Sequence, residues 1–233
     1  MLCTQGHAIV FFATSKVPNK YSIMTDILTP HQHFPSLIYS VEKPEYLDAV
    51  NEVSQRYLTA RKNSEPKPDP MHPVQTNGYA HEPSLAAFTG YIAQAAWTIL
   101  NDQGHDVASL GTYIQEMWSQ EHNQFNGHDE HIHSRGAQIT GMYFLDCPEG
   151  GSRVAIHDPR YGRNQIALPE ADLNKITQAS STVLFIPKPG TMYFFNSWLP
   201  HSVTRNPGTE PTRLVHFNLG MKDLPAASQA TVI

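Results

Sequence analysis

TVLFIPKPGTMYFFN, residues 182–196, consists of two short apolar runs joined by the turn at 187–190. Short runs rich in β-branched and aromatic side chains, bounded by proline and glycine, are typical of β-strands. Similar runs lie on both sides, and they predict strands at 112–118, 137–145, 152–157, 182–187, 191–196, 201–205 and 212–219. Strands at this density indicate a sandwich or barrel.

The residues before these strands have a helical pattern instead. Pro44 suits the first turn of a helix, and apolar residues recur at helical spacing until about Lys62. A second helix is predicted from about Ser84 to Leu100, while the proline-rich stretch 63–83 is a loop. The expected fold is mostly β, with the N-terminal helices packed on a C-terminal β core.

The length of 233 residues suits one domain with an accessory helical part. We expect a single domain over 31–223, with its helical part at about 43–105 and its β core at about 110–220. Residues 1–30 are expected to be a disordered extension and residues 224–233 a tail. Met24 is a second candidate start, which leaves open whether residues 1–23 belong to the natural protein.

Composition excludes several classes of protein. The formal net charge of −5 argues against a nucleic-acid partner, and no apolar run has the length of a membrane span. The two cysteines, Cys3 and Cys147, form no disulfide framework, which favours a reducing compartment and hence the cytoplasm.

Thirteen histidines are present, and the segment HDEHIH at 128–133 concentrates candidate metal ligands. In an extended backbone, residues two apart share a face, so His131 and His133 can converge on one ion. His128 and Glu130 can do the same on the opposite face. Only one of the two pairs should hold the metal.

A third ligand must come from elsewhere, and His201 is the best candidate because it begins a predicted strand after an apolar one. An Fe(II) oxygenase needs three protein ligands on one face of the metal, usually two histidines and a carboxylate. The set His128, Glu130 and His201 meets that rule, whereas His131, His133 and His201 supply three neutral imidazoles. Five other histidines have no other candidate ligand nearby, and we interpret them as surface residues: His31, His33, His72, His81 and His105.

Arg213 follows His201 by twelve residues. If 201–206 and 212–219 pair as a hairpin, the two residues lie close together across the ladder. The planar guanidinium then suits a carboxylate at the far end of a metal-chelating keto acid. The alternative is an ordinary surface ion pair.

These residues resemble a known family at several positions. The chain carries HIH, then TGMYFL, then HDPR, and later FNSWLPHSV, an arginine and a closing FN (131–133, 140–145, 157–160, 195–203, Arg213 and 217–218). This order resembles a family of 2-oxoglutarate/Fe(II) oxygenases from marine bacteria and phages. The likeness extends over roughly residues 33–220.

The resemblance implies a double-stranded β-helix (a cupin-like jelly roll) that uses Fe(II), 2-oxoglutarate and O₂. It implies iron ligands at His131 and His201, with His133 where related families carry a carboxylate. It also implies that Arg213 binds 2-oxoglutarate and that Tyr143 lines its pocket. The loop at 134–137 departs from the family pattern, so Glu130 stays an alternative ligand.

The predicted function is therefore that of a 2-oxoglutarate-dependent dioxygenase that hydroxylates a small molecule or a peptide and releases succinate and CO₂. Barrel oxygenases often pair, so a homodimer is expected. One alternative is a three-histidine cupin metalloenzyme that does not use 2-oxoglutarate. The other is a jelly-roll binding module without catalysis.

Overall fold

The computed structural model describes residues 31, 33–65, 67, 69–165 and 168–225. The chain divides into two compact units, Met1–Pro35 and Ser36–Ile233, and every helix and strand of the described residues lies in the second. The extension expected at 1–30 and most of the tail expected at 224–233 lie outside the described residues. No helix in the described ranges is long and apolar enough to cross a membrane.

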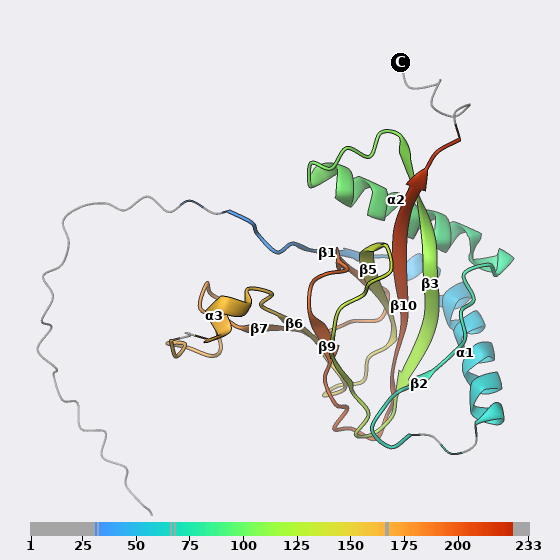
Figure 1. Cartoon of the computed structure of the whole chain (residues 1–233). Helices are drawn as coiled ribbons and strands as arrows, with labels where there is room; N and C mark the ends of the chain where they lie inside the picture. The colour runs from blue at the N-terminus through green and yellow to red at the C-terminus, as the bar shows by residue number, and fades with distance from the viewer. Residues whose placement is uncertain (1–30, 32, 66, 68, 166–167, 226–233) are drawn as a thin grey trace, which may run out of the picture. The chain divides into compact units, whose positions relative to one another are not determined.

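Two antiparallel sheets form the β core (Figure 1). The larger sheet has the strand order β1 (Ile38–Glu42), β8 (Thr191–Asn196), β5 (Ala137–Asp146), β10 (Thr212–Asp223), β3 (Leu110–His122) and β2 (Val74–Gln75). The smaller sheet has the order β4 (His128–His131), β9 (His201–Val203), β6 (Val154–His157) and β7 (Thr182–Phe185). From β3 to β10 the chain alternates between the sheets at every strand except the consecutive pair β6 and β7, which agrees with the predicted jelly roll.

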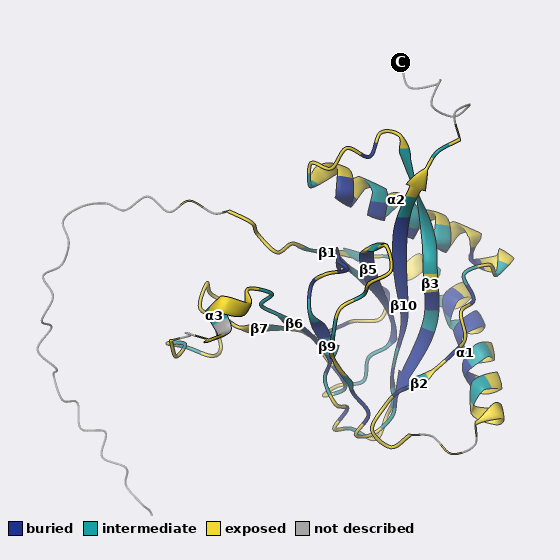
Figure 2. Ribbon diagram, in the orientation of Figure 1, coloured by how far each residue is buried: buried dark blue, intermediate teal, exposed yellow. Residues whose placement is uncertain are grey.

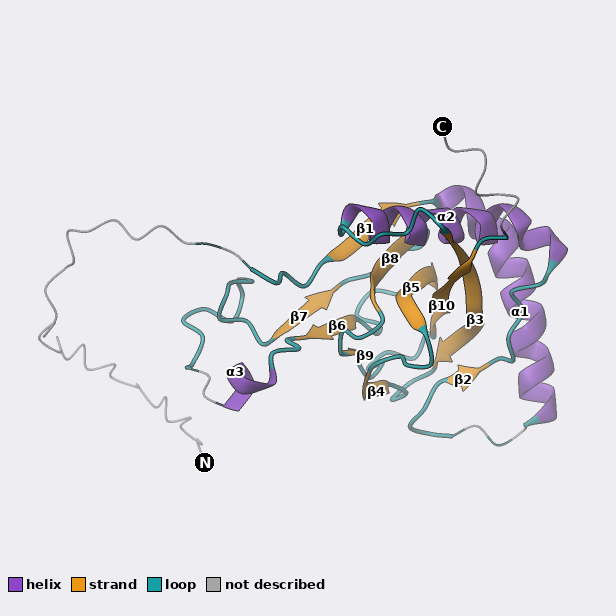
Figure 3. Ribbon diagram, turned by 45° about the horizontal axis from the view of Figure 1, so that its top comes forward, coloured by secondary structure: helices purple, strands orange, loops and turns teal. Residues whose placement is uncertain are grey.

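Helices cover only the larger sheet (Figure 3). A short 3-10 helix, η1 (Pro44–Tyr46), leads into α1 (Leu47–Ser64), and η2 (Pro83–Leu85) leads into α2 (Ala86–Asp102). Proline opens each of these 3-10 turns, where its missing N–H costs no hydrogen bond. The buried residues of the two long helices recur every three to four positions, which gives each helix one apolar face.

The two faces of the larger sheet therefore pack against different partners. Side chains of β10 alternate between them, so Val215 and Phe217 join the helix-side core with Phe88 of α2. Leu214 lies on the other face, in the core between the sheets, together with Val203 of β9. Figure 2 shows the middle of β10 as continuously buried, as a strand covered on both faces must be.

One predicted connection is wrong. Residues 201–206 and 212–219 do not form a hairpin, because β9 pairs with β4 and β6 whereas β10 pairs with β3 and β5. The segment between β9 and β10 crosses from one sheet to the other, as jelly-roll connections do. The sequence pattern also missed β2 and the five-residue helix α3 (Tyr161–Gln165).

Gly141 of β5 allows the closest approach of two strands in the helix-side core. It lies opposite Phe217 of β10, and a Cβ atom at position 141 would lie 2.1 Å from the buried Phe217 ring. Gly141→Ala should therefore lower the free energy of unfolding by about 1–3 kcal/mol, because the ring has no free space to enter. Urea denaturation measures the effect.

Gly90→Ala is the matched control, since position 90 lies in α2 with nothing within 4 Å of the added Cβ atom. Alanine favours a helix over glycine, so this variant should gain about 0.5–1 kcal/mol. Equal changes in both variants would contradict the packing argument.

Candidate metal centre

His131 and His201 are direct cross-strand neighbours in the smaller sheet. His131 ends β4 and His201 begins β9, and opposed side chains of an antiparallel pair lie on the same face. Their ring centroids are 4.4 Å apart. Strand pairing alone therefore brings together two candidate ligands separated by seventy positions in the chain.

His133 joins them from the loop that follows β4. Its backbone N–H donates to the Ser197 carbonyl at 2.9 Å, which ties this loop to the end of β8. The ring centroid lies 5.0 Å from that of His131 and 5.2 Å from that of His201. One ligand atom from each of the three rings lies within 4.8 Å of the others.

The unpartnered nitrogens of these rings fit a metal ion. Nδ1 of His131 lies 2.7 Å from the Asp129 carbonyl, and Nδ1 of His201 lies 2.9 Å from the Leu199 carbonyl. A carbonyl oxygen only accepts, so each Nδ1 carries the proton and each Nε2 presents a lone pair. The Nε2 atoms of His131, His133 and His201 are all buried without a hydrogen-bond partner among the described residues. A divalent cation satisfies all three at once.

Burial keeps two of these rings neutral. Desolvation, together with the neighbouring histidines, lowers the pKa of His201 to about 3 and that of His133 to about 4. A metal binds the neutral imidazole, so the two rings are ready to coordinate at neutral pH.

An amide of the larger sheet orients His133. Nδ2 of Asn218 lies 3.1 Å from Nδ1 of His133 and donates to Glu116 at 3.2 Å. Thr140 donates to Oδ1 of Asn218 at 2.8 Å, so the amide is held from both ends. A metal bound at Nε2 of His133 requires the proton on Nδ1, and Asn218 accepts the hydrogen bond from that proton when its amide is turned so that Oδ1 faces the ring.

Asn218→Ala should therefore weaken divalent-metal binding by about 10- to 100-fold, since it releases the ring of one ligand. Anaerobic titration with Fe(II) measures the change. Asn126→Ala is the control, because Asn126 is also buried but bonds to the carbonyls of Asp69 and Pro70. The control should lose stability and keep metal affinity; a loss of metal in both would show a general effect of unfolding.

The sequence pattern placed His128 on the opposite face of the strand from His131, and this prediction is wrong. A β-bulge lies between His128 and His131, and it turns both rings to the same side, where they stack with centroids 4.3 Å apart. His128 is tied to the Gln120 amide at 3.1 Å and lies outside the three-histidine group. Glu130, the alternative ligand, is half-exposed, and its carboxylate lies 3.6 Å from Nδ1 of His157.

Arg213 and Tyr143 lie away from the three histidines, on the face of the larger sheet that the helices cover. Nε of Arg213 donates to Glu121 at 2.8 Å and Nη1 donates to Asp146 at 2.9 Å. Glu121 also binds Lys62 of α1. Tyr143 packs on Phe88 of α2, and its hydroxyl donates to the Lys43 carbonyl. The roles expected for both residues stay predictions.

The sequence argument missed His216 and Trp118, which lie beside the histidine group. They are cross-strand partners on β10 and β3, and their rings stack with centroids 4.5 Å apart. A signal for His216 was present: it lies two positions from both Leu214 and Asn218, and therefore on the same face of the strand.

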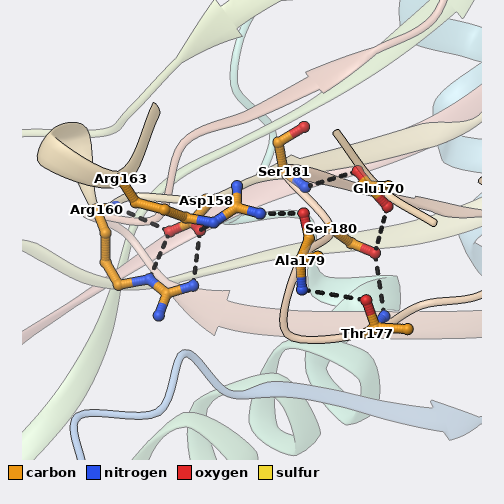
Figure 4. Close-up of polar contacts among 8 residues, drawn as sticks. All are labelled: Asp158, Arg160, Arg163, Glu170, Thr177, Ala179, Ser180 and Ser181. Atoms are coloured by element: carbon orange, nitrogen blue, oxygen red, sulfur yellow. Dashed lines mark hydrogen bonds and ion pairs between the residues drawn. The ribbon is translucent and has the colours of Figure 1, made fainter. Parts of the chain in front are cut away.

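Asp158 and Arg160 form a local ion pair rather than part of the histidine group (Figure 4). Arg160 donates to both oxygens of Asp158, at 2.9 and 2.8 Å, and Nε of Arg163 lies 3.3 Å from the same carboxylate. Arg163 also donates to the Ala179 carbonyl. These contacts lower the pKa of Asp158 and join the segment of α3 to the residues that precede β7.

Comparison with known proteins gives one family and one fold. A family model described as "Putative 2OG-Fe(II) oxygenase" matches residues 116–218, which include all three histidines of the group. A search of curated protein sequences gives no match. Among solved structures, the chain is similar to AviO1 from Streptomyces viridochromogenes Tue57, with 11% identity, a TM-score of 0.56 and coverage of 82% of this chain and 91% of that one.

Two hydroxylases share the same fold. A prolyl-4-hydroxylase from Pseudomonas putida aligns with 11% identity and a TM-score of 0.51, over 79% of this chain and 92% of that one. A viral collagen prolyl hydroxylase from Paramecium Bursaria Chlorella virus-1, solved as a 2OG complex, aligns with 12% identity and a TM-score of 0.50, over 78% and 94%. At these low sequence identities, the comparison shows a shared fold and nothing more.

Proposed function

We propose that this chain, which matches a 2-oxoglutarate/Fe(II) oxygenase family model over residues 116–218, holds Fe(II) on His131, His133 and His201 and hydroxylates an organic substrate. The observation that carries the proposal is the convergence of three buried Nε2 atoms without partners. Structural ion pairs and surface histidines do not leave three lone pairs unsatisfied at one point.

The three imidazoles leave part of the coordination sphere open, as an Fe(II) oxygenase requires. With 2-oxoglutarate and O₂, the iron supplies the oxidising chemistry, and succinate and CO₂ are released. The protein orients the ligands through the Asp129 and Leu199 carbonyls and through Asn218. The apolar core between the sheets excludes water from one side of the centre.

The substrate class we infer is a small molecule or a peptide. Two apolar side chains next to the proposed ligands in sequence are about half exposed: Ile132 at 55% and Trp198 at 51%. Exposed apolar residues beside a metal site suit the apolar part of a substrate. Two of the similar structures are prolyl hydroxylases, which agrees with this class. The homodimer and the cytoplasmic location stay predictions.

Anaerobic visible absorption tests the function. Fe(II) is added to the metal-free protein, followed by 2-oxoglutarate, and a charge-transfer band should appear only when both are present. Admitting O₂ should then release succinate. The band should be absent in His131→Ala, His133→Ala and His201→Ala and should persist in Glu130→Ala, since Glu130 lies outside the histidine group.

Other outcomes point to the alternatives. Bound metal without a band would identify a cupin that does not use the keto acid. No bound metal would leave a jelly-roll binding module. A band lost in Glu130→Ala and kept in His133→Ala would overturn the proposed ligand set.

A further inference from the structure

His216 is a completely buried histidine for which the protein itself offers no hydrogen bond. Its exposed fraction is 0%, and both ring nitrogens lack a partner among the described residues. A neutral imidazole has one donor and one acceptor, and leaving such a group unsatisfied costs about 1–3 kcal/mol. A native fold keeps such a group when a bound molecule satisfies it.

The strand pattern directs His216 towards the metal side of the larger sheet. Its neighbours Val215 and Phe217 face the helices, so His216 faces the smaller sheet. Its ring centroid lies 4.8 Å from that of His133, 5.9 Å from that of His201 and 6.4 Å from that of His131. His216 is therefore set back from the three-histidine group, on the side of His133.

Trp118 adds a second unsatisfied donor at the same place. Its ring stacks on His216 with an interplanar angle of 16°, and its Nε1 is buried without a partner among the described residues. An indole N–H can only donate. Two buried N–H groups on stacked rings next to a metal centre form a site for an acceptor such as a carboxylate.

A cavity borders one member of this pair. It has a volume of about 480 Å³ and lies between β3 and the segment that follows β2. Its lining includes Trp118, Glu116, Thr76 and His81, but not His216. The indole of Trp118 therefore stands between this cavity and His216, on which it stacks.

The only arginine on this strand is not available for that carboxylate. Arg213 faces the helices, and Glu121 and Asp146 already occupy its guanidinium. Glu121 is buried and has Lys62 as its second partner, so the cluster balances its own charges.

We propose that His216 and Trp118 bind the carboxylate of the 2-oxo acid that does not coordinate the metal, the role that the sequence assigned to Arg213. This inference rests on the proposed function, because it assumes that the oxo-acid end of 2-oxoglutarate binds the metal. The remaining carboxylate then needs donors within the length of a short diacid. The stacked pair supplies two neutral N–H groups in a buried position, where each hydrogen bond to a charged group is strong.

The test is the dissociation constant of 2-oxoglutarate, measured anaerobically from the absorption band of the Fe(II)-loaded protein. His216→Phe keeps a stacking ring and removes both nitrogens, and it should raise the dissociation constant by about 10- to 100-fold. Trp118→Phe removes one donor and should raise it by about 3- to 10-fold. Fe(II) affinity should stay unchanged in both, since neither residue belongs to the three-histidine group.

Arg213→Gln is the matched comparison, and its dissociation constant for 2-oxoglutarate should stay within about 2-fold of wild type, although its stability falls because Glu121 loses a partner. 2-Oxobutyrate, which lacks the distal carboxylate, should bind wild type and His216→Phe alike. Thermal unfolding of each variant checks that it is folded.

The outcomes separate the two proposals. No band in wild type defeats the proposed function itself. A band in wild type, with equal 2-oxoglutarate affinity in folded His216→Phe and Trp118→Phe, defeats this inference alone. A large loss of affinity in Arg213→Gln without a loss in the two phenylalanine variants would return the role to Arg213.

Discussion

Replacing His201 with alanine should abolish tight Fe(II) binding, with a loss of affinity of more than about 100-fold. His201 is completely buried, its Nδ1 is fixed by the Leu199 carbonyl, and its Nε2 meets those of His131 and His133. Without it, two imidazoles remain, and they cannot form a three-point facial site. Equilibrium dialysis with Fe(II) under anaerobic conditions measures the loss.

The control for this prediction is His105→Ala. His105 is exposed and lies in no metal-ligating group among the described residues, so its removal should leave Fe(II) affinity unchanged. Unfolding by urea separates a lost ligand from a lost fold. A folded His201→Ala that still binds Fe(II) as tightly as wild type would disprove the site.

The metal-free protein should lose stability steeply as the pH falls below about 6.5. Burial lowers the pKa of His122 and His201 to about 3, that of His128 and His133 to about 4, and that of His216 well below its usual value. In the unfolded chain these groups titrate near 6.5, so between that pH and about 3 the unfolded state binds more protons. Stability is thus complete above 6.5 and falls as the pH drops through this window.

The expected loss of unfolding free energy per pH unit is large. Each such group contributes about 1.4 kcal/mol per pH unit, so five contribute about 7 kcal/mol per unit, against a typical total stability of 5–15 kcal/mol. Urea midpoints at about pH 7.5, 6.5 and 5.5 measure the slope. Carboxylates with lowered pKa values, such as Glu121, titrate below 4.5 and add to the loss only there.

Two comparisons test the cause. His122 is buried and bonds Gln120, outside the proposed ligands, so a folded His122→Gln variant should show about one fifth less slope. Bound metal holds the imidazoles neutral and should shift the loss to lower pH. A stability that does not change between pH 7.5 and 5.5 would contradict the prediction.

Arg213 shows how far spacing along the chain can mislead. The spacing of twelve residues between His201 and Arg213 suggested a hairpin, in which these two residues would lie in neighbouring, paired strands. In the structure His201 and Arg213 belong to different sheets. Neighbouring residues of β10 point alternately towards the histidine group and towards the helices. Because strand side chains alternate, a shift of one residue moves a side chain to the other face, and Arg213 contacts Glu121 and Asp146 on the face of the helices.

The sequence by itself indicated most of the strands, the two long helices and the three histidines as one of two candidate ligand sets, because each depends on local pattern: alternation, helical spacing, turn residues and the H-x-H segment. Only the tertiary structure decided which ligand types meet. The bulge in β4 turns His128 towards His131 and leaves Glu130 half-exposed, and the pairing of β9 with β4 brings His201 to His131. The same holds for His216 and Trp118, which are ordinary core positions in the sequence. Their unsatisfied nitrogens exist only where two sheets enclose them, because water would otherwise supply the missing hydrogen bonds.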